Sequence, residues 1–352
     1  GMETRYVPAV ISDRGPIFEN AGQGLNSWYI GGFTDFGGLR QVFEMARASN
    51  LAAFWAALSM HQLPCFNIVY ADREGNIFYL YNTKAGLRVS PSADNQQNPN
   101  DPTLTQDWRV PVSSDLSSMA WRGVIPIHNL PRVLNPPSGY IQACGNPPWM
   151  VTDPSPFAPS LWPAWLFHDQ NSYRSIRVRQ LLNQGPRSFR DHQSMLFDVL
   201  VPAAVDMVPA ILHAASSRKD RVSNAHPDFW KGLEVLRNWN YIAEVNSTGM
   251  TFYHFWWNFA RNRAARHFPS DAAFYEAAIN NVPGAQDILL RAVEEAANAL
   301  RNEYGDVKIK WGDVHRIRYN NREAPLPGGH SGEPVFVASD RKSTRLNSSH
   351  YS

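Results

Sequence analysis

The chain has 352 residues, of which 43% are hydrophobic, 12% aromatic and only 18% charged. That composition is typical of a globular protein and excludes an intrinsically disordered one, because enough apolar surface is present to form a core. No apolar run reaches the roughly 20 residues that a membrane-spanning helix needs, and residues 1–15 show no basic head followed by a hydrophobic stretch. We therefore expect neither membrane insertion nor a targeting signal in this sequence.

The formal net charge of +2 originates at the C-terminal end. Residues 340–352 carry three basic side chains and one acidic side chain, so the rest of the chain is neutral and no nucleic-acid partner is expected. The stretch DRKSTRLNSSH (340–350) is similar to the translation of a common sequencing-library adapter. We predict that residues 340–352 are an adapter-derived tail, and the alternative is a natural polar tail.

Strands are predicted to dominate the first part of the chain, residues 1–150. Tyr6–Ser12 is a short β-branched run. The runs Phe66–Tyr70 and Asn76–Tyr81 flank a polar turn at Ala71–Gly75, which predicts a β-hairpin. The alanine-rich, amphipathic spacing of Leu39–Ser59 predicts one continuous helix.

Helices are expected to dominate residues 160–305, with return strands in 306–339. A strand is predicted at Gly139–Gln142, after a proline-rich turn, and a last one at Val314–Tyr319. The order of strands, helices and strands again predicts an α+β fold in which strands from both ends share one sheet. The expected helices are Tyr173–Leu182, Asp191–Ala215, Pro227–Trp239, Met250–His267, Ala272–Ile279 and Ala285–Tyr304.

Ser331 lies in the glycine-rich string GGHSGEP (328–334), which invites comparison with a catalytic serine loop. A trypsin-like protease also needs a histidine and an aspartate from a double β-barrel, and the preceding residues are predicted to be helical. A nucleophile elbow needs glycines two residues before and two after the serine. We expect a surface glycine loop here, and an independent trypsin-like hydrolase is the competing hypothesis.

Histidines and cysteines give no clustered metal-ligand spacing. His315 lies in a β-like run, where a hydrogen-bonded structural imidazole is a simpler interpretation than a metal ligand. Cys65 and Cys144 are far apart in sequence and form no disulfide framework. We expect buried free thiols, and the alternative is that the two cysteines meet in space and pair.

Phe252, Phe255, Trp256 and Phe259 recur at helical spacing. Such a stripe is most simply part of the core, and the functional alternative is that it forms the wall of an acyl-binding pocket. On that alternative, we name Phe252 and Trp256 as candidate substrate-binding residues.

Three arginines, Arg174, Arg177 and Arg179, crowd one predicted helix. Spacing alone does not assign them a function, because most such arginines are solvated or structural.

Four strings, taken together, resemble the penicillin acylase family of N-terminal nucleophile hydrolases. Their order matches the later part of the family's β chain, and the resemblance covers about residues 5–339, leaning towards the acyl-homoserine lactone acylase branch. The strings are NIVYADREGNIFYLY (67–81), NPPSGYIQACGNPPW (135–149), YRSIRVRQLL (173–182) and WGDVHRIRYNNREAPLPGG (311–329).

The resemblance implies an αββα sandwich with a large helical insertion, and a serine at the free N-terminus of the β chain that attacks a linear amide. The sequence begins Gly1-Met2-Glu3, without such a serine. We therefore expect a fragment that is inactive alone and that needs its α chain and an upstream β segment as partners. The intact enzyme is expected to be periplasmic or secreted, to act on a small-molecule N-acyl amide, to need no organic cofactor and to carry structural calcium.

The same resemblance assigns roles to individual residues. Relatives carry two asparagines flanking one residue where this sequence has Ala143-Cys144-Gly145, and Asn146 follows one place later. We expect Asn146 to take over the oxyanion role through a shift that Gly145 permits, with a turn asparagine before proline as the alternative. A non-catalytic scaffold or binding module is the alternative for the whole protein.

Arg174 aligns with an arginine that lies near the active site of relatives, where it orients neighbouring groups. Asn67 and Tyr70 lie on the hairpin strand that runs close to that site, and their expected role is structural.

Overall fold

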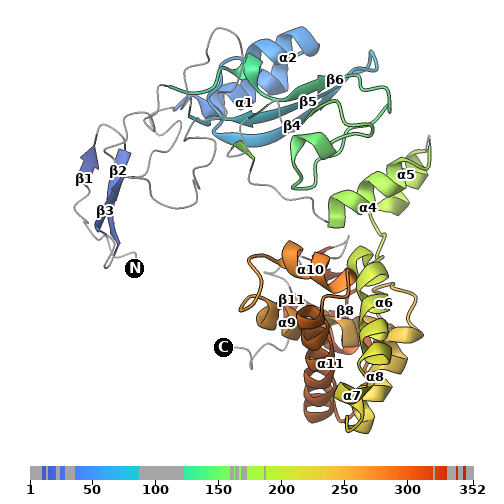
Figure 1. The fold of residues 1–352 in the computed structure, drawn as a ribbon. Helices are drawn as coiled ribbons and strands as arrows, with labels where there is room; N and C mark the ends of the chain where they lie inside the picture. Colours follow the sequence, from blue (N-terminus) through green and yellow to red (C-terminus); the bar gives the residue numbers. More distant parts are fainter. Residues whose placement is uncertain are drawn as a thin grey trace. The chain divides into compact units, whose positions relative to one another are not determined.

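The structure is a computed structural model in which the chain divides into two compact units, Gly1–Asn171 and Ser172–Ser352, each described by itself (Figure 1). The residues described are 10–12, 15–20, 24–27, 36–86, 123–158, 162, 166–167, 173–185, 188–319, 322–330, 338–339 and 344–345.

The described strands of the first unit form two antiparallel sheets, each with its strands in sequence order. The strand predicted at Tyr6–Ser12 is described from Val10 onward, where β1 confirms it. The first sheet consists of β1 (Val10–Ser12), β2 (Gly15–Asn20) and β3 (Gly24–Ser27), and the second of β4 (Cys65–Ala71), β5 (Ile77–Thr83) and β6 (Arg132–Leu134).

The predicted hairpin is confirmed, because β4 and β5 pair in antiparallel over their full lengths. Asp72 closes the turn: one carboxylate oxygen accepts the backbone N–H groups of Glu74 and Asn76, and the other accepts the Asn76 amide and the Tyr70 hydroxyl. These hydrogen bonds, led by the one from the Asn76 side chain, hold the pKa of Asp72 below its usual value. Gly75 completes the turn with a φ of 85°.

Two helices, α1 (Gly38–Arg47) and α2 (Leu51–Leu58), lie on one side of the second sheet (Figure 1). The prediction of one helix over Leu39–Ser59 is wrong, because the chain leaves helical geometry at Ala48. Asn50 then begins α2, accepting a backbone N–H at 2.9 Å through its side chain. Asparagine favours this position since it satisfies a donor that the helix leaves unpaired, and this cap outweighs the alanine-rich propensity.

The two faces of the β4-β5-β6 sheet bury different side chains, as the two-residue period of a strand requires. Phe78 and Leu80 pack with α2 in one hydrophobic cluster. Tyr79, between them in sequence, packs with Val133 and Val151 in another. Both faces of this sheet are therefore covered by apolar side chains.

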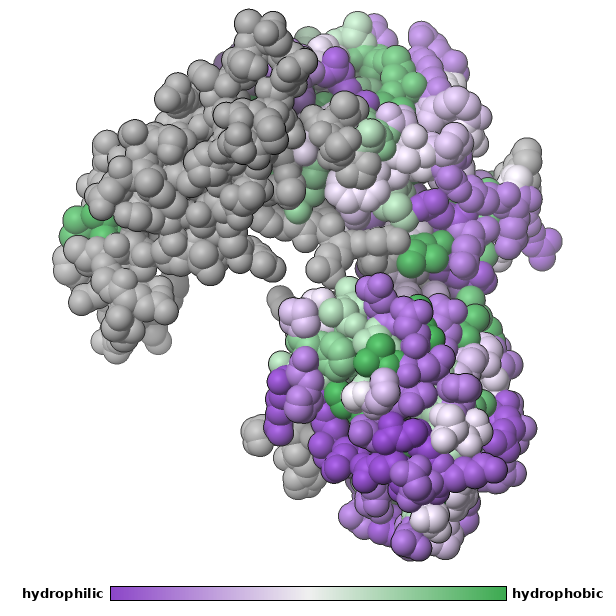
Figure 2. All heavy atoms as spheres, in the orientation of Figure 1, coloured by the Kyte–Doolittle hydropathy of each residue, from purple (hydrophilic) through white to green (hydrophobic). Residues whose placement is uncertain are grey.

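The second unit is mainly helical. Hydrophilic residues cover most of the face of this unit that Figure 2 shows, and the large apolar side chains lie inside. Its helices are α4 (Tyr173–Leu182), α5 (Phe189–Met195), α6 (Pro202–Ser217), α7 (Lys219–Val222), α8 (Pro227–Arg237), α9 (Thr248–Ala264), α10 (Asp271–Ile279) and α11 (Pro283–Tyr304).

Residue types at the helix ends account for several of these bounds. Pro227 and Pro283 occupy the first position of α8 and α11, where a missing N–H costs nothing. Ser247 and Ser270 cap α9 and α10 by accepting backbone N–H groups at 3.0 and 3.1 Å. Gly305, with a φ of 81°, ends α11.

The helix predicted at Asp191–Ala215 is wrong in its middle, because residues 196–201 separate α5 from α6. Pro202 starts α6 and disfavours helical geometry in the residue before it. That residue, Val201, instead donates its N–H to the carbonyl of Tyr241 at 2.9 Å. The other predicted helices are confirmed, with ends shifted by up to three residues.

Strands return after the helical part. β7 confirms the strand predicted within Val314–Tyr319, and β7 pairs with β8 and β11, while β9 pairs with β10. In the described part of the chain, the strands of each unit pair within that unit, and the sheet shared by both ends of the chain stays a prediction. The elements are α12 (Trp311–Val314), β7 (Arg316–Tyr319), β8 (Arg322–Pro325), β9 (Gly329–His330), β10 (Ala338–Ser339) and β11 (Thr344–Arg345).

Candidate functional site

The candidate site is the corner Ser138–Trp149 of the first unit. The strand predicted at Gly139–Gln142 is wrong, because this segment bonds to the turn that follows it instead of to a neighbouring strand. The backbone N–H of Gln142 donates to the carbonyl of Val151 at 2.8 Å, and its side-chain amide donates to the carbonyl of Met150 at 2.5 Å. Gln142 thereby joins the segment before the turn to the segment after it, at Met150 and Val151.

Asn146 lies inside this corner, with 1% of its surface exposed. Its side-chain Oδ1 accepts the backbone N–H of Cys144 at 2.7 Å, and its Nδ2 donates to the carbonyl of Pro147 at 3.0 Å. Both ends of the amide are therefore bonded to adjacent backbone, as in a turn asparagine. One hydrogen of Nδ2 remains, since an amide nitrogen carries two.

Gly145 forms the tip of the corner. Its φ of 69° lies in the left-handed region, which glycine adopts without steric cost. A Cβ atom added there would meet no other atom within 4 Å, so the backbone at the tip faces open space. The corner thus exposes backbone at its tip and keeps the side chain of Asn146 inside.

Gln142 also carries a buried acceptor that the sequence reasoning missed. Its Oε1 atom has no hydrogen-bond donor among the described residues, although the residue is only 5% exposed. A buried polar atom without a partner is costly. This acceptor is therefore a place where a donor from another segment or a ligand would be stabilised. The only sequence signal was the glutamine of the GYIQ string.

The hairpin residues named from the resemblance have structural contacts. Asn67 Oδ1 accepts the hydroxyl of Tyr79 at 2.7 Å. Tyr70 donates to Asp72 at 3.0 Å, and its ring lies 4.6 Å from that of Phe54, centroid to centroid. These contacts confirm the structural role expected of both residues.

The three arginines of α4 have different surroundings. Arg177 forms a bidentate ion pair with Asp198, with distances of 3.1 and 2.7 Å, and is structural. Arg174 is half-buried, and its Nε has no hydrogen-bond partner among the described residues. Its predicted positioning role stays a prediction. Arg174 belongs to the second unit and Asn146 to the first.

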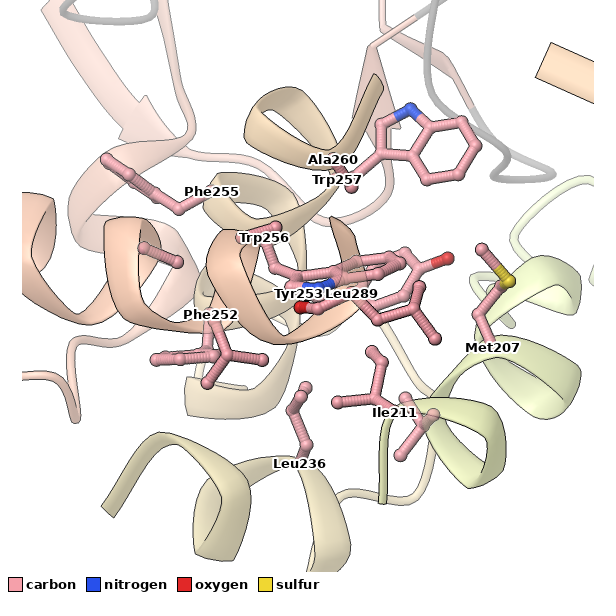
Figure 3. Close-up of a cluster of buried hydrophobic side chains, with 14 of the residues drawn as sticks. Met207, Ile211, Leu236, Phe252, Tyr253, Phe255, Trp256, Trp257, Ala260 and Leu289 are labelled. Carbon is pink, nitrogen blue, oxygen red and sulfur yellow. Dashed lines mark hydrogen bonds between the residues drawn. The ribbon is translucent and has the colours of Figure 1, made fainter. Parts of the chain in front are cut away.

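Phe252 and Trp256 lie together on α9, and both are fully buried. Figure 3 shows them between Leu236 of α8, Ile211 of α6 and Leu289 of α11. The indole N–H of Trp256 donates to the carbonyl of Leu289 at 3.1 Å. A substrate could reach these rings only if the core opened, so their packing is that of core residues. Their substrate-binding role stays a prediction.

His315 is fully buried beside Trp311, with the two rings stacked at 4.7 Å. A ring nitrogen, Nδ1, lies 2.8 Å from the carbonyl of Leu326, which confirms the hydrogen-bonded structural interpretation. Ser331 lies outside the described residues.

The prediction that both thiols are free is confirmed, because neither Cys65 nor Cys144 forms a disulfide. The prediction that both are buried is wrong: Cys65 is exposed at the start of the edge strand β4, and Cys144 is half-buried in the corner.

No group of three or more His, Cys, Asp or Glu side chains in the described ranges could hold a metal ion. These residues do not form a complete calcium site, and no proposed chemical step depends on a metal. Among the helices that the structure describes, none is both long and apolar enough to cross a bilayer.

Comparison with known proteins gives consistent matches. A sequence profile of the family described as penicillin amidase matches residues 2–351. The acyl-homoserine lactone acylase PvdQ of Pseudomonas syringae pv. syringae (strain B728a) is 24% identical over 329 residues, which are 85% of this chain and 40% of the relative. Penicillin G acylase of Escherichia coli is 28% identical over 199 residues, which are 56% of this chain and 21% of the relative.

Among solved structures, a thermostable penicillin G acylase from Alcaligenes faecalis superposes with a TM-score of 0.60 at 18% identity. The match covers 87% of this chain and 59% of that one. It confirms the predicted α+β fold of the N-terminal nucleophile hydrolase type. This chain spans less than half the length of the two curated relatives.

Proposed function

The chain belongs to the penicillin amidase family, and from that premise we propose that it is part of an N-acyl amidohydrolase that cleaves a linear amide of a small molecule. The observation that carries this proposal is the family match over residues 2–351. The relatives named as acyl-homoserine lactone acylase and penicillin G acylase support the same reaction class. We propose acyl transfer to a serine and then to water.

The nucleophile in this proposal is a serine at a free N-terminus, contributed by sequence beyond the Gly1-Met2-Glu3 start. Its hydroxyl attacks the amide carbonyl while the α-amine of the same serine takes the proton. The amine product leaves with that proton, and water then attacks the acyl ester to release a carboxylic acid. Without that serine, the 352-residue chain would be inactive by itself.

The corner Ser138–Trp149 supplies the oxyanion donors in this proposal. Donors aimed at the developing charge stabilise a tetrahedral intermediate because they need no reorganisation during the reaction. The second Nδ2 hydrogen of Asn146 is one candidate donor. The open tip at Gly145 supports access of a substrate to this corner.

An α chain and an upstream β segment are the proposed partners. The unpaired Oε1 of Gln142 supports this proposal, because a donor from such a segment would satisfy it. A periplasmic or secreted location and structural calcium are likewise proposed for the intact enzyme.

The test is to recover the longer coding sequence and express the protein that it encodes. We expect self-cleavage that exposes a serine, hydrolysis of an N-acyl amide probe, and loss of both activities when that serine is changed to alanine. The 352-residue chain alone, assayed in parallel, should show no hydrolysis. A longer sequence without a serine at the junction, or hydrolysis that survives the serine change, would contradict the proposal.

A second candidate function is that of a non-catalytic homologue acting as a scaffold or binding module. It is favoured by one observation: the side-chain amide of Asn146 is bonded at both ends to adjacent backbone, as in a turn asparagine. An extended protein that folds and binds N-acyl amides without turnover would support this alternative.

A further inference from the structure

A cavity of about 390 Å³ lies in the first unit between α2 and the β6 edge of the sheet. One wall comes from Leu51 and Trp55, which are four residues apart and so share a face of α2. The other walls come from Phe78 of β5 and from Arg132 and Leu134 of β6. The volume falls in the lower part of the range of about 300–1,000 Å³ that small-molecule sites occupy.

The strand register explains why these side chains meet. Phe78 pairs with Leu134, and Leu80 pairs with Arg132 across the two strands. Directly paired residues point to the same face of a sheet, so Arg132 and Leu134 extend the face on which Phe78 and Leu80 pack with α2.

Four of the five lining side chains are apolar. Phe78 is buried beneath the ring of Trp55, which it meets edge to face at 5.8 Å between centroids. Leu134 is 50% exposed, which leaves apolar surface open to solvent at the wall of the cavity. Covering this surface with an apolar ligand would be favourable.

The fifth lining residue supplies a charge. The guanidinium of Arg132 lies 5.4 Å from the centroid of the Trp55 ring, and its Nη1 donates to the carbonyl of His128. No carboxylate pairs with it among the described residues, and none of the five lining residues is acidic. A guanidinium has five N–H donors in a planar fork that matches a carboxylate, so most of its donors remain available.

We propose that this cavity binds a small apolar carboxylic acid, with its chain or ring between Trp55, Phe78 and Leu134 and its carboxylate on Arg132. Charge complementarity decides the ligand class: a neutral apolar molecule would leave the guanidinium unused, and an amine would be repelled. The proposal does not depend on the proposed hydrolase function, because it concerns binding to residues that all lie in this chain.

The test is calorimetric titration of the full 352-residue chain with octanoate and with octanamide, which has the same chain length and no charge. Octanoate should bind about tenfold more tightly than octanamide, because a charge-assisted hydrogen bond is stronger than a neutral one. Arg132→Gln should lower the affinity for octanoate to that for octanamide and leave the affinity for octanamide unchanged. Arg132→Lys keeps the charge and loses the planar fork, so its affinity for octanoate should lie between those of the parent and Arg132→Gln.

Two further variants separate the cavity from the rest of the surface. Leu134→Trp should fill the cavity and lower the affinity for both ligands. Circular dichroism should show that this variant is folded, since position 134 is half-exposed. Arg73→Gln removes an exposed arginine in the β4–β5 turn that does not line the cavity, and binding should not change.

Four results would overturn the proposal. The first three are the absence of saturable octanoate binding up to about 1 mM, equal octanoate affinity in the parent and Arg132→Gln, and undiminished binding in folded Leu134→Trp. The fourth is a loss of octanoate affinity in Arg73→Gln equal to that in Arg132→Gln, which would show general charge attraction instead of a site.

Discussion

The Oδ1 atom of Asn146 accepts the backbone N–H of Cys144 at 2.7 Å, across the left-handed residue Gly145. This bond makes Asn146 part of the corner's own framework. A catalytic asparagine in this position would therefore have two tasks, holding the turn and donating to an oxyanion. Two substitutions of the same residue can separate these tasks.

Asn146→Asp keeps the oxygen that bonds to Cys144 and removes the amide donor, whereas Asn146→Ala removes both. If Asn146 donates to the oxyanion, both changes in the longer enzyme should lower kcat by about 100-fold to 1,000-fold, or about 2.7–4 kcal/mol. Only the alanine variant should lose the bond to Cys144, at a cost of about 0.5–1.5 kcal/mol in urea denaturation. Activity of both variants within about threefold of the parent would contradict the oxyanion role.

The arginines of α4 should differ in what they stabilise. Arg177→Ala breaks the bidentate pair with Asp198, whose side chains are only 19% and 17% exposed, and should lower the free energy of unfolding by about 1–3 kcal/mol. Arg174→Ala removes a side chain whose Nε has no partner in the described structure. The free energy of unfolding should therefore change by less than about 0.5 kcal/mol. Denaturant titration of both variants makes this comparison. Equal losses would show that Arg174 has a structural partner.

Two glycines of the helical unit should not tolerate alanine. A Cβ atom at Gly249 would overlap the side chain of Trp239, and one at Gly232 would overlap the ring of Phe252. Either change should destabilise the protein by about 1–3 kcal/mol, because a packed core accommodates an extra methyl only by shifting. Gly284→Ala in α11 is the control, since its Cβ would meet nothing within 4 Å, and it should stabilise by up to about 1 kcal/mol. Similar melting temperatures for all three variants would contradict this packing.

Asp228 should make stability depend on pH in acid. Burial works against its charge, but hydrogen bonds from Lys231 and Arg301 and the charge of His226 outweigh burial and hold the pKa of Asp228 below its usual value. The folded pKa of Asp228 is below the unfolded value of about 3.9. The contribution of the Asp228 carboxylate to the free energy of unfolding is therefore present above about pH 4 and is lost as the pH falls through the folded pKa.

Urea denaturation between about pH 3 and pH 6 should therefore show that the difference in free energy of unfolding between the parent and Asp228→Asn becomes smaller as the pH falls. A difference that stays constant over this range would contradict the assignment. Asp271→Asn, at an exposed ion pair with Arg261, is the control and should cost less than about 1 kcal/mol at neutral pH.

The sequence alone was sufficient where a structure depends on neighbours in the chain. The β-rich runs Phe66–Tyr70 and Asn76–Tyr81 predicted the β4–β5 hairpin, because strand-forming residue types and a polar turn are local properties. The same holds for α4, whose bounds agree with the predicted Tyr173–Leu182. The α+β class and the family followed from these patterns and from the order of the quoted strings.

Only the tertiary structure decided what each pattern contacts. The N–H of Val201 bonds to Tyr241, some 40 residues away in sequence, and this contact lies in the break between α5 and α6. The aromatic spacing of α9 predicted an apolar face, but not that Phe252 and Trp256 would be enclosed by three other helices. Periodicity specifies which face of an element is apolar, and it contains no information about what covers that face. Asn146 shows the same limit for a polar group, because an amide can bond to its own turn or outward, and only the folded corner decides which.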